Sequence, residues 1–366
     1  MNNELSDLKN INWGEFKIED IFNIERSKVH DKINLKETHR GIAHISRTNL
    51  DNGLNCIVVN ENFEHNPKNT IVFGAENANF FFQPFNYITG DKMYVITNEK
   101  FNKYNSLFIK LMLEYSIKHS GFGYGKGLTG NRLKRMSILL PITESRLPDW
   151  NFMEFYIKTK EKSLLREYKS YLDEKLLLIQ DRKKYLISKD EFFTKNVKWG
   201  TFILSEIFEI ESTSSGIDKN KLINTKGTIP YITRTDENNG CADFIGKQDE
   251  KYIKNKGNVI TIGLDTQTVF YQVSEFYTGQ NIQIVYNNKL NKYNALFIIP
   301  LLKKLMKKFN WGGNGATLTR LKKSRIRLPI DSKKNPDWDF MESYMKNLEY
   351  EKINMDLNYI EKKLND

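Results

Sequence analysis

The sequence carries the same series of motifs twice, and this internal repeat limits the fold more than any other feature. The tetrapeptide Trp-Gly-Glu-Phe at 13–16 returns as Trp-Gly-Thr-Phe at 199–202, and the matched pairs keep an offset between 186 and 189 residues. A constant order at a nearly constant offset predicts two domains with the same fold. The other matched pairs are Ile-Phe at 21–22 and 207–208, Ile-Ser-Arg-Thr at 45–48 with Ile-Thr-Arg-Thr at 232–235, Asn-Gly at 52–53 and 239–240, Asn-Lys-Tyr-Asn at 102–105 and 291–294, Arg-Leu-Lys at 132–134 and 320–322, and Leu-Pro-Ile at 140–142 and 328–330.

A Pro-Asp-Trp tripeptide and a long charged segment follow each copy, at 148–150 and 336–338. Both segments predict helices, in which Asp149 and Asp337 cap the first amides. About 38 helical residues in the first segment would give a rod of roughly 55 Å. Its apolar residues recur at steps of three, four, four, three and seven, a narrow seam typical of a coiled-coil partner. They are Leu165, Tyr168, Leu172, Leu176, Ile179 and Leu186, and the less regular seam of the second segment is Met341, Met345, Leu348, Leu357, Ile360 and Leu364.

An isolated helix with so thin an apolar stripe is marginally stable in water, so we expect the two helices to pack on each other, antiparallel. Two independent surface helices are the alternative. The predicted fold class is α+β, with two repeated mixed α/β domains separated and followed by long helices that form an antiparallel coiled coil. The expected boundaries are 1–147 for the first domain, 148–190 for the first helix, 191–335 for the second domain and 336–366 for the second helix.

Within each copy the local patterns are mixed. Runs of β-branched and aromatic residues predict strands, Asn-Gly predicts tight turns, and Leu-Pro is expected to end a last apolar strand. Helical spacing is present at 107–115 and 296–307, where Asn105 or Asn294 could cap the helix. The predicted strands are 70–73, 94–96, 258–262 and 282–285.

The overall charge indicates the class of partner. The formal net charge of +11 favours a polyanion, nucleic acid first and an anionic membrane second. No apolar run approaches the roughly 18 residues that a membrane span needs, and the first residues lack the features of a signal peptide. With Cys56 and Cys241 as the only cysteines, we expect a reducing, cytoplasmic setting.

On these motifs the chain resembles the specificity subunits of type I restriction–modification systems, including the related subunits of type IIB enzymes. The resemblance rests on the Trp-Gly-x-Phe opening, the Ile-Ser/Thr-Arg-Thr segment with its Asn-Gly turn, the Leu-Pro-Ile end and the helix after each copy. It covers nearly the whole chain, and the duplicated order is more specific than any single motif. The residues do not distinguish a type I from a type IIB system.

The resemblance implies two target recognition domains, each of which reads one half of a bipartite site on double-stranded DNA. It implies modification (methyltransferase) subunits as partners, which bind S-adenosylmethionine and transfer the methyl group, and a restriction subunit as a further partner. This chain itself is then expected to carry no catalytic residue, no cofactor and no membrane contact.

Motifs that would indicate chemistry of its own are incomplete. The Gly-rich run at 121–127 lacks the spacing and the Ser or Thr of a phosphate-binding loop, and Pro-Asp at 148–149 lacks the acid-x-Lys of a nuclease. His39 and His44 are five positions apart, which suits neither one helix face nor one strand face, so no metal site is predicted. The alternatives are a stand-alone DNA methyltransferase or nuclease-associated enzyme, and a coiled-coil adaptor without a DNA role.

Comparison of the two copies locates candidate DNA contacts. Matched residues more often build the scaffold or touch phosphates, whereas stretches that differ, such as 75–80 against 264–269, are candidates for base reading. Asn and Gln suit adenine, and Arg and Lys suit guanine. Each Asn or Gln is alternatively a solvated turn residue, and Arg47 and Arg234 are alternatively structural ion-pair partners or phosphate contacts. The candidates are Arg47, Asn77, Asn79, Tyr124, Lys126, Arg132, Arg234, Gln267, Trp311, Asn314 and Arg320.

Overall fold

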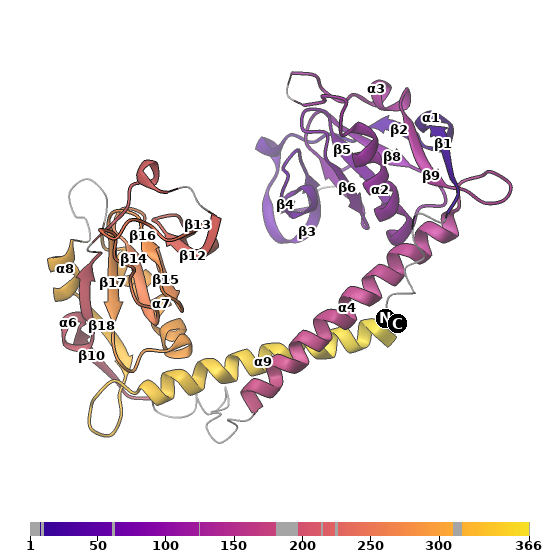
Figure 1. The fold of residues 1–366 in the computed structure, drawn as a ribbon. Coiled ribbons are helices and arrows are strands. Elements are labelled where there is room, and N and C mark those ends of the chain that lie inside the picture. Colours follow the sequence, from indigo (N-terminus) through magenta and orange to yellow (C-terminus); the bar gives the residue numbers. More distant parts are fainter. Residues whose placement is uncertain are drawn as a thin grey trace. The chain divides into compact units, whose positions relative to one another are not determined.

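The computed structural model describes residues 8, 11–60, 63–123, 125–180, 197–213, 215–223, 226–309 and 317–365. The chain forms two compact units, Met1–Tyr168 and Lys169–Asp366. Each unit contains one copy of the repeat, and the two ribbons run through equivalent elements in the same order (Figure 1). The predicted fold class of two repeated mixed α/β domains, each followed by a long helix, is therefore confirmed.

The described part of the first unit contains three small sheets. Strands β8 and β5 lie inside a four-stranded antiparallel sheet of order β2-β8-β5-β6, β3 pairs with β4 and with β7, and β1 pairs with β9. The elements are β1 (Trp13–Lys17), α1 (Ile18–Ile21), β2 (Asn23–Arg26), β3 (Glu37–Ile45), β4 (Leu54–Val58), β5 (Thr70–Gly74), β6 (Phe80–Gln83), β7 (Tyr87–Thr89), β8 (Met93–Thr97), α2 (Lys103–Ile117), α3 (Gly130–Lys134), β9 (Ser137–Pro141) and α4 (Trp150–Gln180).

The second unit repeats this topology. Its sheets have the orders β11-β17-β14-β15, β13-β12-β16 and β10-β18, which correspond one to one to those of the first unit. The elements are β10 (Trp199–Ile203), α6 (Leu204–Ile207), β11 (Glu209–Ser212), β12 (Lys226–Ile232), β13 (Cys241–Ile245), β14 (Val259–Gly263), β15 (Val269–Gln272), β16 (Tyr277–Thr278), β17 (Ile282–Tyr286), α7 (Lys292–Met306), α8 (Leu318–Lys323), β18 (Arg325–Pro329) and α9 (Trp338–Asn365).

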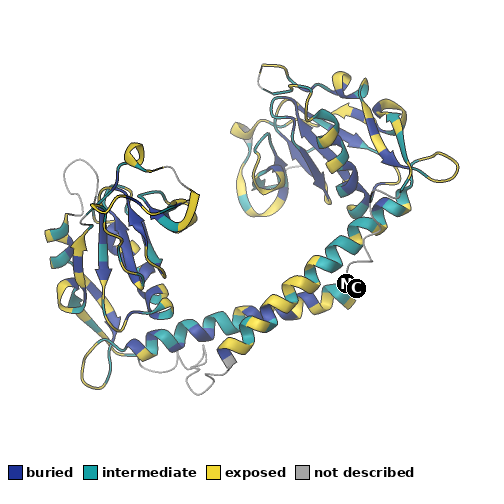
Figure 2. Cartoon of the chain, in the orientation of Figure 1, coloured by how far each residue is buried: buried dark blue, intermediate teal, exposed yellow. Residues whose placement is uncertain are grey.

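An inner strand of each four-stranded sheet is buried along its whole length. β5 reads Thr-Ile-Val-Phe-Gly, β14 reads Val-Ile-Thr-Ile-Gly, and all five residues of each strand are buried (Figure 2). β-Branched side chains suit this position because they pack well on a covered, pleated surface. Helix α2 contributes Ile109 and Leu113 to the first core, and α7 contributes Ile298 and Leu302 to the second.

The N-termini of α2 and α7 correct one prediction. Asn102 caps α2: its side chain accepts hydrogen bonds from the backbone N–H groups of Tyr104 and Asn105. Asn105, which was expected to be the cap, instead accepts from the backbone N–H of Asn102 over 2.9 Å and completes a capping box. Asn291 and Asn294 repeat the arrangement. The helices therefore begin one turn earlier than their apolar spacing indicates, because a cap and its box are polar.

Other local predictions hold with small shifts. Asn52 and Gly53 adopt φ angles of 53° and 80° in the turn between β3 and β4, the left-handed conformation that Asn-Gly tolerates. The last strand of each domain ends at its Pro, as expected. Asn258 was expected inside a strand, but it precedes β14 with a φ of 57°.

The long helices begin as predicted. Asp149 accepts a hydrogen bond from the backbone N–H of Phe152, and Asp337 accepts one from Phe340, both over 2.9 Å. The first turns then pack onto the domain that precedes them: Met153 is part of the core of the first unit, and Met341 of the second. None of the helices among the described residues is apolar over a length that could cross a membrane.

The end of α4, from Lys169 on, belongs to the second unit, where it contacts α9. Lys169 Nζ of α4 lies 3.4 Å from Glu361 Oε1 of α9, which favours packed helices over independent ones. Tyr168, predicted in the seam, is instead 45% exposed, and its polar end can stay in water. Leu186 lies outside the described residues. Beyond the first turns, the buried apolar residues of the two helices are Leu172, Ile179, Ile353, Leu357 and Ile360.

Candidate nucleic-acid interface

Backbone hydrogen bonds join several loops of the first unit. The N–H of Gly90 donates to the carbonyl of Ile45 at the end of β3, and the N–H of Ala75 donates to the carbonyl of Lys92, both over 2.9 Å. The N–H of Leu128 donates to the carbonyl of Ala75 over 2.6 Å and attaches the Gly-rich segment before α3. We call residues 46–49, 75–79, 90–92 and 125–128 the first loop cluster.

The second unit builds the same cluster. The N–H of Gly279 donates to the carbonyl of Ile232 over 2.8 Å, and the N–H of Leu264 donates to the carbonyl of Asn281 over 3.1 Å. We call residues 233–236, 264–268 and 279–281 the second loop cluster. The counterpart of the Gly-rich segment at 310–316 lies outside the described residues, and with it the candidates Trp311 and Asn314.

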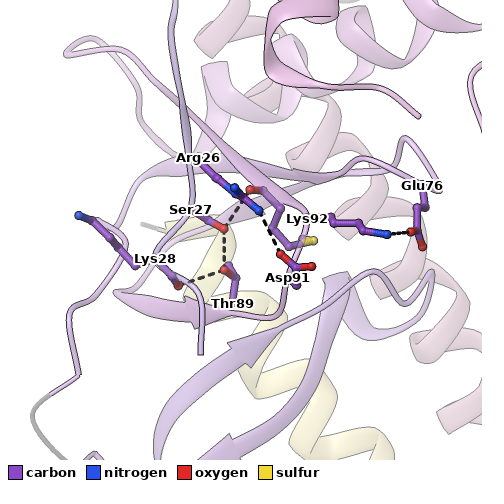
Figure 3. A network of polar contacts seen from close by, with 8 residues as sticks. Arg26, Ser27, Lys28, Glu76, Thr89, Asp91 and Lys92 are labelled. Carbon is purple, nitrogen blue, oxygen red and sulfur yellow. Dashed lines mark hydrogen bonds and ion pairs between the residues drawn. The ribbon is translucent and has the colours of Figure 1, made fainter. Parts of the chain in front are cut away.

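An acidic residue holds the first loop cluster together. Arg47 Nη1 donates to Glu76 Oε2, and Lys92 Nζ lies 2.6 Å from Glu76 Oε1. The hydrogen bond from Lys92 and the positive charges of Arg47 and Lys92 lower the pKa of Glu76. Figure 3 shows the contact between Lys92 and Glu76 beside a second pair, Arg26 and Asp91. Arg26 Nη2 donates to Asp91 Oδ1 over 3.3 Å. One carboxylate thus joins three loops and neutralises part of their charge.

An ion pair between an Arg and an acidic residue also joins the loops of the second loop cluster. Arg234 Nη1 donates to Asp265 Oδ2, and Asn281 Nδ2 lies 3.3 Å from the same oxygen. Glu76 and Asp265 are not among the site residues predicted from the sequence, although they stand two residues after Gly74 and Gly263, which occupy the same place in the two copies. The ion-pair alternative for the matched Arg residues is therefore the arrangement found in the free chain, and their DNA contacts stay a prediction.

The two candidate Asn residues of the first cluster converge on one acceptor. Asn77 Nδ2 donates to Asn49 Oδ1 over 2.9 Å and also to the carbonyl of Arg47, and Asn79 Nδ2 donates to Asn49 Oδ1. Asn77 Oδ1 is buried and has no hydrogen-bond partner among the described residues. Both side chains therefore tie the loop after β5 to the loop after β3, and both residues are half-buried.

Two candidate cations lie at the Gly-rich segment, Lys126 within the first loop cluster and Arg132 on the adjoining helix α3. Gly123 and Lys126 exchange two backbone hydrogen bonds of 3.1 Å, and the Lys126 ammonium lies 5.0 Å from the centre of the Phe122 ring. Arg132 Nη1 donates to the carbonyl of Gly127. Both cationic side chains are exposed, and Tyr124 lies outside the described residues. The segment is a loop, as its glycines predict.

In the second unit, Gln267 Nε2 donates to the carbonyl of Phe309 at the edge of the undescribed segment. Arg320 lies on the exposed side of α8, whose N-terminus is capped by Thr317. The structure thus brings Arg234 and Gln267 into the second loop cluster and leaves Arg320 on the neighbouring helix.

A surface hollow of about 410 Å³ opens beside Arg234. It is lined by Asp218 and Lys219, from a stretch that differs between the copies, and by Gln280 of the second loop cluster. Tyr231 also lines it, and the Tyr231 hydroxyl donates to the carbonyl of Ile217 over 2.7 Å. The hollow offers both hydrogen-bond donors and acceptors next to a guanidinium, which suits the edge of a base beside a phosphate.

Comparisons with known proteins show the same duplication of the domain. A family model described as type I restriction modification DNA specificity domain matches residues 10–167 and again 196–358. The type II restriction enzyme BgcI specificity subunit S.BcgI of Heyndrickxia coagulans is 28% identical over 346 residues, 93% of this chain and 95% of the relative. The S subunit of a type I restriction-modification system from M. genitalium has a similar fold, with a TM-score of 0.57 and 16% identity over 97% of this chain and 93% of that chain.

The family model covers both copies of the repeat and most of the helix after each copy. Both loop clusters, with the ion pairs and hydrogen bonds described above, lie within the two matched ranges. The chain therefore belongs to the family of type I restriction modification DNA specificity domains, and it is a specificity subunit that carries two of them.

Proposed function

We propose that each loop cluster reads one half of a bipartite site on double-stranded DNA. The observation that carries this proposal is the duplicated Arg–acid pair, Arg47 with Glu76 and Arg234 with Asp265. Both pairs hold loops of otherwise different sequence at the same place on the same scaffold. Two unlike half-sites require this combination, since the scaffold presents the loops and the loop side chains select the bases.

The two loop clusters carry different side chains at positions where their backbone conformation is the same. Ala78 and Gln267 both adopt a left-handed backbone, with φ angles of 52° and 59°, so one fold position carries a methyl group in the first unit and an amide in the second. Lys92 and Asn281 are a second such pair, at φ angles of 58° and 61°. These substitutions exchange charge and hydrogen-bonding groups without a change of backbone, which supports two different base preferences.

We assign roles by this comparison. The Arg residues that match in both copies contact phosphates, and the differing residues contact base edges. Tyr124, Trp311 and Asn314 belong to the second group, because they stand on Gly-rich segments that differ between the copies. The proposed phosphate contacts are Arg47, Arg132, Arg234 and Arg320, and the proposed base contacts among the described residues are Asn79, Lys126 and Gln267.

The proposal includes protein partners. The chain acts with modification subunits, which bind S-adenosylmethionine, and with a restriction subunit, in the cytoplasm where the chromosome is accessible. Large apolar side chains on α4 support a docking role for the helices, because exposed apolar surface marks contact sites. Those more than half exposed are Phe155, Leu164, Tyr171, Leu177 and Leu178.

A domain exchange tests the function. Residues 13–147, within the proposed first domain 1–147, are replaced by the equivalent segment of a relative with a different target, while the proposed second domain 191–335 stays unchanged. Methylated positions are then mapped across the host genome by single-molecule sequencing. We expect one half of the methylated site to change and the other half to stay. An unchanged site, or the loss of both halves with the complex intact, would contradict the proposal.

Duplex binding at several salt concentrations separates the alternatives. The assembled complex is expected to bind its mapped site more tightly than a scrambled duplex, with an affinity that falls steeply as salt increases. A coiled-coil adaptor would bind both duplexes equally or not at all. A stand-alone enzyme would methylate or cut DNA as the purified chain, which we do not expect.

A further inference from the structure

Polar contacts tie the start of α4 to the first domain. Asn102 Nδ2, at the N-terminus of α2, donates to Glu154 Oε2 of α4 over 2.7 Å. Glu154 Oε1 in turn accepts from Lys158 Nζ over 2.5 Å, and two turns along, Lys103 Nζ lies 2.7 Å from Glu161 Oε1. We call these five residues the first helix clamp.

The second unit contains the same three contacts in the same order. Asn291 Nδ2 donates to Glu342 Oε2 of α9 over 2.7 Å, Lys346 pairs with Glu342, and Lys292 Nζ lies 3.2 Å from Glu349 Oε1. We call these residues the second helix clamp. Both clamps also place a Lys against a ring at the start of the domain helix: Lys158 lies 4.9 Å from the centre of the Tyr104 ring, and Lys346 5.1 Å from that of Tyr293.

The helix clamps fix the direction of each long helix relative to its domain, which apolar packing alone does not determine. Trp150 and Met153 attach α4 to the core, but apolar burial is non-directional. Asn102 is different, because its Oδ1 already accepts two backbone N–H groups as the cap of α2. Its Nδ2 can therefore point in one direction only, and the Glu154 carboxylate lies there as a charged acceptor with a narrow geometry. The angle between domain and helix is thus set by a polar junction.

We propose that the two helix clamps set the length of the DNA spacer that the protein accepts between its half-sites; this rests on the proposed bipartite recognition. Helix α4 has 31 residues, which at 1.5 Å per residue give about 46 Å. A rotation of about 5° at one end moves the other end by about 4 Å, which is more than the roughly 3.4 Å rise of one base pair. Discrimination of one base pair therefore needs the junction held within a few degrees.

The variants remove the clamp without touching the loop clusters. Glu154→Ala with Glu342→Ala removes the central acceptor from both units. Lys103→Ala with Lys292→Ala removes the outer ion pairs, together with the contacts of these ammonium groups with the Tyr104 and Tyr293 rings, and leaves Glu154 and Glu342 in place. The two Lys side chains are 45% and 48% exposed, so the fold is not at risk. The matched control is Glu114→Ala, which breaks the surface pair with Lys110 inside α2 and leaves α4 untouched.

The complex with its modification subunits is assembled with each variant and titrated with duplexes. The duplexes keep both mapped half-sites and carry the native spacer, one base pair fewer or one more. The natural chain and the Glu114→Ala control are expected to bind the altered spacers at least about tenfold more weakly than the native one. The Glu154→Ala, Glu342→Ala chain is expected to reduce this ratio to about threefold or less, and the Lys103→Ala, Lys292→Ala chain to lower it in part.

The proposal is overturned if the ratio of the affinities for the native and the altered spacers stays at its natural value in the Lys103→Ala, Lys292→Ala chain. An unchanged ratio in a folded Glu154→Ala, Glu342→Ala chain overturns it as well. A duplex with one scrambled half-site separates this failure from that of the proposed function. If scrambling does not weaken binding by the natural chain, bipartite recognition itself is wrong. If scrambling weakens binding and the spacer ratio does not respond to the clamps, only the role of the clamps is wrong.

Discussion

Arg47 and Glu76 form an ion pair across 29 residues of sequence that fastens the end of β3 to the loop after β5. Arg234 and Asp265 form its copy in the second unit, across 31 residues. Each Arg is therefore held in place before any DNA arrives. Pre-positioning of this kind lowers the entropic cost of binding, because the side chain has few conformations left to lose.

Loss of the acid is expected to affect one half-site only. Glu76→Gln removes a negative charge from a cationic surface and releases Arg47 and Lys92, so attraction to any DNA should rise while the loops lose their fixed positions. We expect the assembled complex to lose discrimination at the first half-site by about 1 kcal/mol or more, the size of one weakened base contact. Competition binding with duplexes altered in either half measures this.

Asp265→Asn is the matched control for that prediction, because the same change in the second unit should affect the other half-site. Equal loss at both half-sites in either variant would show that the acids support the overall fold and not their own loop cluster.

Arg47→Ala is expected to lower the salt dependence of binding. A phosphate contact contributes about 0.9 to the slope of the logarithm of the affinity against that of the salt concentration. The slope for the complex should fall by about that amount, with equal weakening for all sequences of the first half-site. Lys110→Ala on α2 serves as the control with the same charge change. Selective loss at one base pair, with an unchanged slope, would make Arg47 a base contact.

Gly74→Ala is expected to disturb the first loop cluster, because Gly74 lies against Asn77 and Arg47. A Cβ at this position would lie 2.6 Å from Asn77 Oδ1 and 2.8 Å from Arg47 Cγ, closer than side chains pack. We expect a loss of about 1–3 kcal/mol in the free energy of unfolding, as for other overpacked sites. Denaturant unfolding gives that value, and duplex competition should show weaker discrimination at the first half-site.

Gly127→Ala is the milder comparison for the same cluster, since its Cβ would meet the Ala75 carbonyl oxygen at 3.2 Å. A Gly74→Ala chain that keeps both its stability and its discrimination would show that Asn77 and Arg47 can move aside without consequence.

His44 is expected to make stability depend on pH near neutrality. Burial lowers the pKa of this imidazole below its usual 6.5, against the effect of the hydrogen bond with the carbonyl of His30 at 3.2 Å. The unfolded chain therefore takes up a proton first as the pH falls below 6.5, and the folded state loses stability until the folded pKa is passed. Above pH 6.5 the contribution is fully present.

Thermal unfolding from pH 8 to 5 measures this effect. Below pH 6.5, the unfolding temperature of the natural chain should fall further than that of a His44→Gln chain. Parallel curves for the two chains would show that His44 does not change its protonation between the folded and unfolded states.

Local signals explain the part of the fold that the sequence predicts. The Asn-Gly turn at 52–53 depends on two residues that tolerate a left-handed backbone, and the start of α4 depends on Asp149, three residues before the amide that it caps. The buried strand β5 was visible in its β-branched run. Each of these features involves neighbours in sequence, so the pattern and the structure have the same cause.

The sequence predicts only part of the candidate site. The repeat singles out Arg47 and Arg234. It does not single out their ion-pair partners, because Glu76 and Asp265 have different side chains and stand in loops of different sequence. The apolar spacing predicts a cap at Asn105, whereas the cap of α2 is Asn102, because apolar periodicity marks the buried face of a helix and does not extend to a polar first turn.

Motif order and spacing are enough to identify two copies of one domain, each followed by a helix, because both can be read along the chain without any knowledge of contacts. Which residues meet depends on the folded molecule: Glu76 pairs with Arg47, and Glu154 with Asn102, 52 residues apart. Such segments come together because the strands and helices between them are buried in the core. The polar groups at their edges then pair according to where the core has placed them, which no local pattern records.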